Sequence, residues 1–262
     1  MTATASPALP VVEASSVTRR YGHAGAPPGG VTGATLRVRA GEIVGVCGPS
    51  GAGKSTLLRL LAGMERPDHG TVTYQGTPAW APSRWRGQRH ARYPRPGYVM
   101  PIYQDPYASL DPRWPIWRTV TEPLLPVAVA GASPPPARRA AAAGHRDTVR
   151  ALLSRSGMDH VDVDARPGEL SGGQCQRIAI LRALIARPSL IVADEPTARQ
   201  DAITAAAMTG QLAETAAAGT AIIVVSHNTP WLQSFATRVI ELTGGRLRPG
   251  GEPPSVTAEE TS

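Results

Sequence analysis

The feature that most constrains this chain is a glycine-rich loop between a short apolar run and a helical one. Residues Gly48–Ser55 read Gly-Pro-Ser-Gly-Ala-Gly-Lys-Ser and match the pattern G-x-x-x-x-G-K-S/T. Ile43–Cys47 before the loop has the composition of a buried strand, and Leu57–Leu61 after it that of a helix. Glycines let the backbone N–H groups point inward, and a helix N-terminus favours negative charge. The pattern therefore predicts a phosphate-binding loop.

Composition makes the lysine of this loop informative. The chain has 26 arginines, a single lysine and a net charge of +7, and it is rich in Ala, Gly and Pro. Arginines scattered in this way are typical of compositional bias, although a basic chain can also bind nucleic acid or an anionic membrane. Lys54 departs from that bias, and its compact charge suits the β and γ phosphates of a nucleotide. The predicted phosphate-loop residues are Gly48, Pro49, Ser50, Gly51, Ala52, Gly53, Lys54, Ser55 and Thr56.

A second chemical pattern is an apolar strand that ends in two carboxylates. Leu190–Ala193 is followed directly by Asp194 and Glu195. In a phosphate-loop fold, an aspartate at such a strand end holds Mg²⁺ together with the loop serine, here Ser55. The neighbouring Glu195 is then placed to orient or deprotonate the attacking water. The sequence thus predicts nucleotide hydrolysis, with ATP and Mg²⁺ as the ligands.

The arrangement of strand and helix patterns predicts a mainly parallel α/β sheet with helices on both faces. After residue 170, helix candidates at Ser171–Ala186 and Ala202–Ala217 alternate with strand candidates at Leu190–Ala193, Ile222–Val225 and Val239–Leu242. Residues 105–168 interrupt this alternation with a turn-rich start, a low-complexity stretch and a helical segment near His145–Ser156. We expect one domain over residues 10–248, with 105–168 as an inserted helical subdomain and 249–262 as a disordered tail.

A third motif, Leu170-Ser171-Gly172-Gly173-Gln174, stands just before a predicted helix and 20 residues ahead of Asp194. A Ser-Gly-Gly start offers a hydroxyl and free backbone N–H groups at a positive helix end. The same residues would also make an ordinary helix cap. The motif resembles the signature of ATP-binding cassette (ABC) ATPases, which implies contact of Ser171, Gly172, Gly173 and Gln174 with the γ-phosphate held by the other subunit of a dimer.

The resemblance covers residues 10–248 and implies further roles for matching positions. The implied fold is an ABC cassette of the phosphate-loop class, with an N-terminal antiparallel β region and an inserted α-helical subdomain. Tyr21 resembles the aromatic that stacks on adenine, and Gln104 the glutamine that touches Mg²⁺ or water. Asp201 resembles the aspartate of the loop that crosses the dimer, although Ala198-Arg199-Gln200 departs from the usual pattern. His227 resembles the histidine that contacts the γ-phosphate.

The stretch Tyr103–Arg113 contains Gln-Asp-Pro-Tyr-Ala-Ser-Leu and resembles the peptide and nickel importer branch of that family. The implied partners are permease subunits, a second identical or homologous ATPase subunit in a head-to-tail dimer, and indirectly a substrate-binding protein. Little sequence follows Gly245, which favours the nickel or metal-chelate type, or an unusual peptide type. The longest apolar runs are too short to span a bilayer, and Met1–Ser16 lacks a secretory pattern. We expect a peripheral protein at the cytoplasmic membrane face.

Two other classes of function stay open on the sequence. A nucleic-acid-related ABC ATPase could use the Trp/Tyr/Arg stretch from Trp80 to Arg95, although we expect no nucleic-acid partner. An ABC-type ATPase of a multisubunit enzyme, such as a carbon–phosphorus lyase system, is the other alternative. For the importer, a docking surface is predicted from apolar residues after Gln104, or else these residues close the insertion's own core. They are Tyr107, Leu110, Trp114, Ile116 and Trp117.

Overall fold

Two β-sheets and a set of helices make up the structure, a computed structural model that describes residues 8–22, 29–80, 94, 97–124, 137–198, 200 and 202–249. The smaller sheet is antiparallel and has the order β2-β1-β4-β5. Its long strands alternate buried and exposed side chains, as a sheet with one face on a core should. The predicted N-terminal antiparallel region is therefore confirmed. The strands are β1 (Val12–Tyr21), β2 (Gly29–Val38), β4 (His69–Tyr74) and β5 (Thr77–Pro78).

The larger sheet has the order β10-β9-β3-β8-β7-β6 and carries the predicted parallel topology. All its pairs are parallel except β10 with β9. Every residue of β3 and β8 is buried, which explains their continuous apolar runs, since both faces of this sheet are covered. The strands are β3 (Ile43–Cys47), β6 (Val99–Ile102), β7 (Leu190–Asp194), β8 (Ala221–Val225), β9 (Arg238–Thr243) and β10 (Arg246–Pro249).

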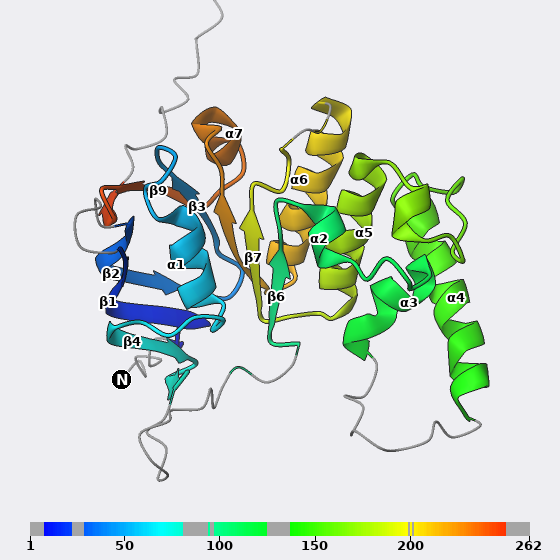
Figure 1. Ribbon diagram of the computed structural model, residues 1–262, viewed down its shortest axis with the longest axis horizontal. Coiled ribbons are helices and arrows are strands. Elements are labelled where there is room, and N and C mark those ends of the chain that lie inside the picture. Colours follow the sequence, from blue (N-terminus) through cyan, green and yellow to red (C-terminus); the bar gives the residue numbers. More distant parts are fainter. Residues whose placement is uncertain are drawn as a thin grey trace, which may run out of the picture.

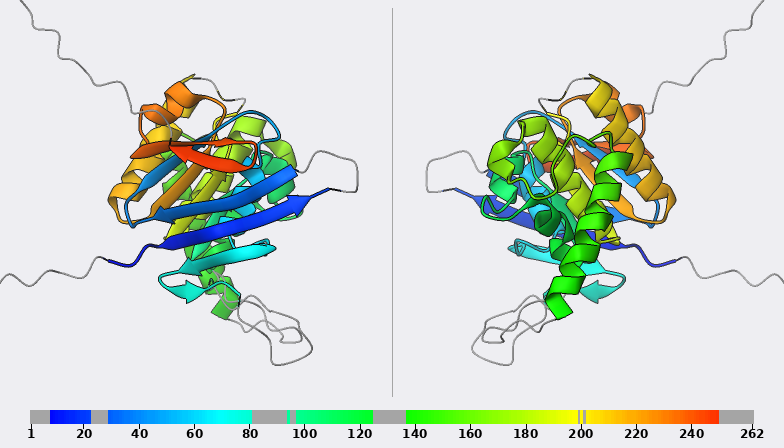
Figure 2. Two further views of the ribbon diagram at one scale, coloured as in Figure 1. Left: turned by 90° about the vertical axis from the view of Figure 1, so that its left-hand side faces the viewer. Right: turned by 90° about the vertical axis from the view of Figure 1, so that its right-hand side faces the viewer.

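Alternate residues of the same strands feed two separate cores. Leu190 and Val192 of β7 pack with the antiparallel sheet and α1 (Lys54–Leu61). Ile191 and Ala193 face the opposite way, toward α5 (Gly172–Ile185), α6 (Ala202–Ala217) and α7 (Thr229–Gln233). Figure 1 shows α1 beside the antiparallel strands, with α6 and α7 across β3 and β7. Figure 2 looks onto the antiparallel sheet, where Thr32 N–H donates to Gly245 O at 2.7 Å and joins the two sheets.

The helical subdomain has a third core, made with one face of α5. Leu110, Ile116 and Leu153 are buried in it, and Trp117 packs against it. The apolar residues after Gln104 therefore serve mainly this core, which narrows the predicted docking surface to the exposed Tyr107 and the half-buried Trp114. The elements are α2 (Pro106–Ser109), α3 (Ile116–Thr121), η1 (Glu122–Leu124), α4 (Ala137–Arg155) and η2 (Pro167–Glu169).

Several boundaries differ from those predicted. Helix α4 begins at Ala137, within the low-complexity stretch, rather than near His145. Strand β10 lies beyond the strand that was expected to be the last, and Pro249 belongs to it rather than to a tail. Helix α7 was not predicted. Residues 250–262, Asp201 and most of Trp80–Arg95 lie outside the described residues, so the predictions made for them stay predictions.

Candidate active site

The parallel sheet brings four of the predicted motifs to one edge. Strands β3, β8, β7 and β6 are neighbours in that order and run the same way, so their carboxyl ends meet. The phosphate loop follows β3, His227 follows β8, Glu195 follows β7 and Gln104 follows β6. Segments nearly 180 positions apart in the sequence meet at this edge. Their side chains can therefore contact a single ligand.

The phosphate loop is held in shape by glycines. Gly48 has φ +148°, and a Cβ there would lie 2.1 Å from the carbonyl oxygen of Leu242, so β9 and the loop can approach only without a side chain. Gly51 has φ +77°, and its would-be Cβ meets no atom within 4 Å. The loop is thus packed against the sheet at Gly48 and open at Gly51. The open side is where a phosphate could be received.

Lys54 is the first residue of α1, and its ammonium bends back over the loop. Its Nζ donates to Gly48 O at 2.7 Å and to Pro49 O at 2.9 Å. These carbonyls hold the charge close to the loop N–H groups and to the N-terminus of α1. Helix dipole and ammonium together make this point electropositive, which suits a polyphosphate.

Two of the three residues predicted at the Mg²⁺ site, Ser55 and Asp194, are in contact. Ser55 Oγ donates to Asp194 Oδ2 at 2.8 Å, so a hydroxyl of α1 and a carboxylate of β7 face each other. Both are hard oxygen ligands of the kind Mg²⁺ prefers. In the described part of the chain, no group of three or more His, Cys, Asp or Glu side chains could form a metal site alone. A pair fits Mg²⁺, which takes its remaining ligands from phosphate and water.

Glu195 is held by the residues that follow β8. Its Oε1 accepts from His227 N–H at 2.8 Å and lies 3.0 Å from His227 Nδ1. Its Oε2 accepts from Ser226 Oγ at 3.0 Å. The Glu195 side chain is 11% exposed and that of His227 77% exposed, so the carboxylate is sheltered while the imidazole faces outward. The pair joins a sheltered carboxylate, a potential base, to an exposed imidazole.

Tyr21 ends β1 within a cluster of charged residues. Its hydroxyl donates to Glu65, and the Arg19 guanidinium lies 5.2 Å from its ring centroid. Burial raises the pKa of the Glu65 carboxyl, but hydrogen bonds from Tyr21, Arg19 and Arg59 outweigh burial and lower it overall. Tyr21 is 37% exposed, so its ring is anchored at the hydroxyl and remains open to a flat ligand.

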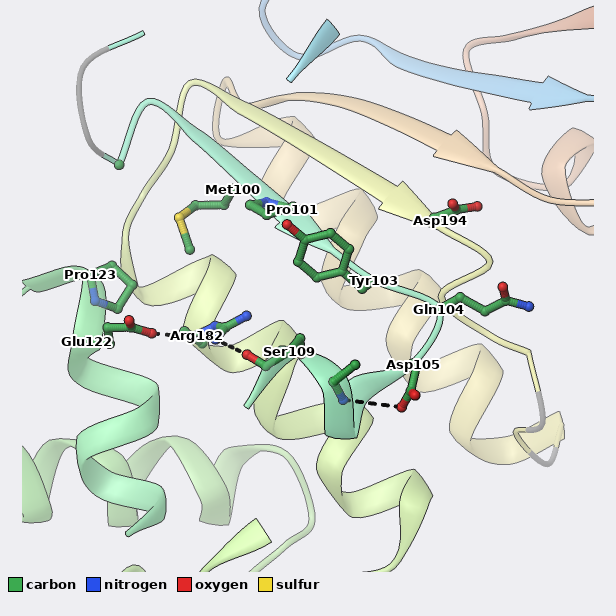
Figure 3. A pocket seen from close by; sticks show the side chains of 12 residues that line it. Met100, Pro101, Tyr103, Gln104, Asp105, Ser109, Glu122, Pro123, Arg182 and Asp194 are labelled. Carbon is green, nitrogen blue, oxygen red and sulfur yellow. Dashed lines mark hydrogen bonds and ion pairs between the residues drawn. The ribbon is translucent and has the colours of Figure 1, made fainter. Parts of the chain in front are cut away.

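Gln104 and Asp194 both line a pocket of about 820 Å³ beside the sheet edge (Figure 3). The pocket continues under Tyr103 to Arg182, whose Nη1 donates to Ser109 O at 2.7 Å. Arg182 also faces Glu122 at 3.5 Å. The pocket therefore connects the end of β7 with the helical subdomain, and Gln104 stands where the two meet.

The Ser-Gly-Gly-Gln motif starts α5 and makes a reciprocal cap. Ser171 Oγ accepts from Gln174 N–H at 3.3 Å, and Gln174 Oε1 accepts from Ser171 N–H at 2.8 Å. Helix α5 lies across β6 and β7 from α1 (Figure 1), so the chain does not fold its own motif onto its phosphate loop. Cys175 is fully buried behind the cap, and burial raises the pKa of its thiol.

Two contributors to this site were not predicted from the sequence. Ser226 is 2% exposed and touches Glu195, although the only signal was a serine directly before His227. Gln200 packs against the motif, since its Oε1 lies 3.1 Å from where a Cβ of Gly173 would be. In the sequence, Gln200 was noted only because Ala198-Arg199-Gln200 departs from the usual pattern of that loop.

Comparison with known proteins gives the same family from a family model and from curated relatives. Residues 31–198 match the family model described as ABC transporter. A nickel import ATP-binding protein, NikE of Rhodospirillum rubrum, is 36% identical over 217 residues, which are 82% of this chain and 72% of that protein. A lipoprotein-releasing system ATP-binding protein, LolD of Gluconobacter oxydans, is 39% identical over 84% of this chain and 87% of its own length.

Peptide-related and structural relatives extend the comparison. A probable D,D-dipeptide transport ATP-binding protein, DdpF of Escherichia coli, is 35% identical over 83% of this chain. The match spans 62% of that relative, less than two thirds of its length. A dimeric ATP-binding cassette in a post-hydrolysis state, bound to ADP and Pi, has a TM-score of 0.71 at 24% identity. It covers 92% of this chain and 100% of that one, and it shows the shared fold.

Proposed function

The chain belongs to the ABC transporter family of ATP-binding subunits, and from this premise we propose that it powers an importer of peptides or nickel chelates. Its enzymatic activity is the ATP hydrolysis of that family. No described helix is both long and apolar enough to cross a bilayer. In line with the importer relatives, permease partners hold the transport pathway in this proposal, and this chain works against the cytoplasmic face of their membrane.

One observation carries the hydrolytic part of the proposal. The Ser55–Asp194 contact and the Glu195–His227 contact lie at the ends of adjacent strands, next to the phosphate loop. A nucleotide whose phosphates bind the loop has its terminal phosphate at this edge. Phosphate, metal ligands and a carboxylate base are then within one small region, which is what in-line attack by water needs.

We assign the residues as follows. Residues of the loop from Gly48 to Thr56 bind the α and β phosphates through backbone N–H groups, and Lys54 compensates the β and γ charge. Glu195 orients and deprotonates the attacking water, and His227 contacts the γ-phosphate. Ser55, Asp194 and Gln104 would hold Mg²⁺ or its water, and the ion would supply Lewis-acid stabilisation of the phosphate charge. Tyr21 stacks on the adenine.

The site is completed by a second subunit. Ser171 and the glycines after it lie away from this chain's own phosphate loop, with backbone N–H groups at the N-terminus of α5. Such a helix start binds anions, so the N-terminus of α5 suits a γ-phosphate presented by a partner cassette. We propose a head-to-tail dimer in which Ser171 and Asp201 of each subunit reach the nucleotide of the other. The partner is identical or homologous.

The variant Glu195→Gln tests hydrolysis and dimerisation together. The amide keeps the shape of the carboxylate but loses the base, so we expect ATP to persist and dimers to form with ATP. Adding Ser171→Arg blocks the facing site and should remove those dimers. Size-exclusion chromatography with ATP measures both. ATP-dependent dimers that survive Ser171→Arg would refute the arrangement, and monomers in every case, even after mixing with the homologous cassette, would refute dimerisation.

Two candidate functions differ in the transported cargo. The Gln104–Leu110 run supports import of peptides or nickel chelates, in line with NikE and DdpF. The match to LolD over 87% of its length favours a lipoprotein-releasing system as the second candidate. Identification of the membrane subunits that co-purify with the tagged chain decides between them, since a permease with a binding protein indicates import.

A further inference from the structure

The hydroxyl of Ser226 is buried at the point where the catalytic edge of the sheet ends. The residue is 2% exposed, and its N–H donates to Val46 O at 3.1 Å, which continues the parallel pairing of β8 with β3. The hydroxyl is therefore fixed by the backbone of the sheet rather than by a flexible loop. A buried hydroxyl needs hydrogen-bond partners. The partners of the Ser226 hydroxyl indicate which residues it positions.

The direction of its hydrogen bonds follows from counting protons. Asn228 N–H donates to Ser226 Oγ at 3.1 Å, so the hydroxyl oxygen acts as an acceptor on that side. A serine hydroxyl has one proton to donate. That proton goes to Glu195 Oε2, 3.0 Å away. Asn228 is itself fixed, because its side chain caps α7 by accepting from Trp231 N–H at 3.1 Å.

Glu195 is constrained from its backbone as well. It has φ +46°, a left-handed conformation that few residues other than glycine adopt, and its N–H donates to Val225 O at 2.9 Å. Its carboxylate then accepts from Ser226 on one oxygen and from His227 N–H on the other. A strained backbone with both carboxylate oxygens bound is typical of a pre-organised functional group.

We propose that Ser226 is a positioning residue for hydrolysis, which aims the Glu195 carboxylate at the attacking water. The inference rests on the proposed role of Glu195 as the base. Of its two bound oxygens, Oε1 accepts from the backbone N–H of His227 at 2.8 Å and lies 3.0 Å from Nδ1 of the exposed His227 ring. The buried Ser226 is the side-chain contact that holds the other oxygen, Oε2, and it does not depend on the position of that ring. Without the Ser226 hydroxyl, Glu195 stays at the nucleotide site, but its carboxylate is no longer oriented toward the attacking water.

The test compares Ser226→Ala with Ser226→Thr in the full chain. Loss of the hydroxyl should lower kcat about 10- to 100-fold, the effect of a misplaced catalytic group, while KM for ATP changes less than about twofold. Threonine keeps the hydroxyl and should restore most of the activity. Combined with Glu195→Gln, the alanine variant should lose nothing further, because the base it aims is already absent.

A matched control separates positioning from folding. Thr220 also has a buried hydroxyl, which donates to Pro188 O at 2.9 Å just before β8 and far along the strand from Glu195. Thr220→Val should leave kcat unchanged even if the melting temperature falls. If Ser226→Ala does not fold, Ser226→Cys fills the same space with a weak donor and should show the same kcat loss.

The outcomes are distinct. Wild-type kcat in Ser226→Ala or Ser226→Cys overturns the inference. A double variant Ser226→Ala/Glu195→Gln with a kcat well below that of Glu195→Gln alone also overturns it. A loss that threonine does not restore, accompanied by the same loss in Thr220→Val, assigns Ser226 to folding and also overturns it. Absence of ATP binding and hydrolysis in the wild-type chain with its partners refutes the proposed function instead.

Discussion

Removal of the single lysine side chain is the sharpest test of the nucleotide site. Lys54 Nζ makes two hydrogen bonds to loop carbonyls, at 2.7 and 2.9 Å, in a partly exposed position. Each such bond contributes roughly 0.5–1.5 kcal/mol, and exposure places these at the low end. Lys54→Ala should therefore destabilise the free protein by about 1 kcal/mol, or a melting temperature about 2–4 °C lower. That is a small structural effect.

The effect on ATP binding should be much larger. Hydrogen bonds to charged groups contribute about 1.5–3 kcal/mol, so loss of the ammonium should weaken ATP binding by up to about 100-fold. At ATP equal to about 100 times the wild-type Kd, bound ATP stabilises the wild type by about 2.7 kcal/mol. With Kd raised about 100-fold, the same concentration contributes only about 0.4 kcal/mol. The ATP-dependent shift in melting temperature should fall from about 5–10 °C to about 1 °C.

Thermal melting with and without Mg-ATP measures both effects in one experiment. Lys54→Arg is the matched control, because it keeps the charge but replaces a compact ammonium with a planar guanidinium, and we expect an intermediate shift. The chain offers an independent check: Lys54 is its only lysine, so an amine-acylating reagent should modify one side chain, and ATP should protect it. Equal ATP shifts in wild type and Lys54→Ala would refute this account.

Three further outcomes are expected. Gly48→Ala should lower the melting temperature far more than Gly51→Ala, because its methyl would lie 2.1 Å from Leu242 O, whereas Gly51 loses only about 1–2 kcal/mol to its left-handed backbone; equal losses would contradict this. Because the pKa of Glu65 is lowered in the fold, its stabilising effect is present above about pH 4.5 and lost as pH falls through the folded value, so acid melting should be less steep in Glu65→Gln. Tyr107→Ser should release the chain from co-purifying membrane subunits without a change in melting temperature, while Leu110→Ser, at a buried position, should lower that temperature; loss of stability in both would assign Tyr107 to the core.

Local chemistry explains why the phosphate loop was predictable. A buried strand, a loop with glycine at fixed places and a helix follow one another over Ile43–Leu61. The local sequence is therefore enough to predict the strand–loop–helix geometry. The same holds for β7, whose apolar run ends in carboxylates. The prediction was good wherever a motif and the elements that position it were contiguous.

Contacts between distant segments were not predictable in this way. The Ser226–Glu195 bond joins residues 31 positions apart and depends on the parallel register of β7 with β8, where Asp194 pairs with Val225. No pattern in the sequence sets that register, because both strands are buried on both faces and carry no alternation. The role of Ser226 therefore appears only in three dimensions.

Helix α5 shows a related difficulty. In the sequence, Ile178, Leu181, Leu184 and Ile185 have the spacing of one apolar helix face. In the structure, Ile178 and Leu181 enter the subdomain core, whereas Leu184 packs with Ile180 against the sheet. A helix shared by two cores is apolar on most sides, so its periodicity cannot assign faces.

Strand β10 was missed although its signal was present. Gly244 and Gly245 both have positive φ and form the two-residue turn between β9 and β10. A Gly-Gly pair between strands is a hairpin signal, but Leu247 is the one aliphatic residue in the sequence Arg246–Pro249, too little to suggest a strand. Turn chemistry here carries more information than hydrophobic pattern.

The register of the sheet also limits how the site can signal to the subdomain. Ile102 of β6 pairs with Ala193 of β7. Counted from this pair, Asp194 is the next residue on β7, and Gln104 is the second residue after Ile102. A shift of Gln104 that follows the γ-phosphate must pass along the segment from Tyr103 to Ser109, because β6 itself is paired and fixed. Arg182 of α5 holds the far end of that segment through Ser109 O at 2.7 Å. The same segment meets α5 at two more points, because Tyr107 donates from its hydroxyl to Leu170 O at 2.9 Å and Gln176 Nε2 donates to Tyr103 O at 3.4 Å. Ser171 caps α5, so the segment after Gln104 is joined to the helix of the signature motif at both ends.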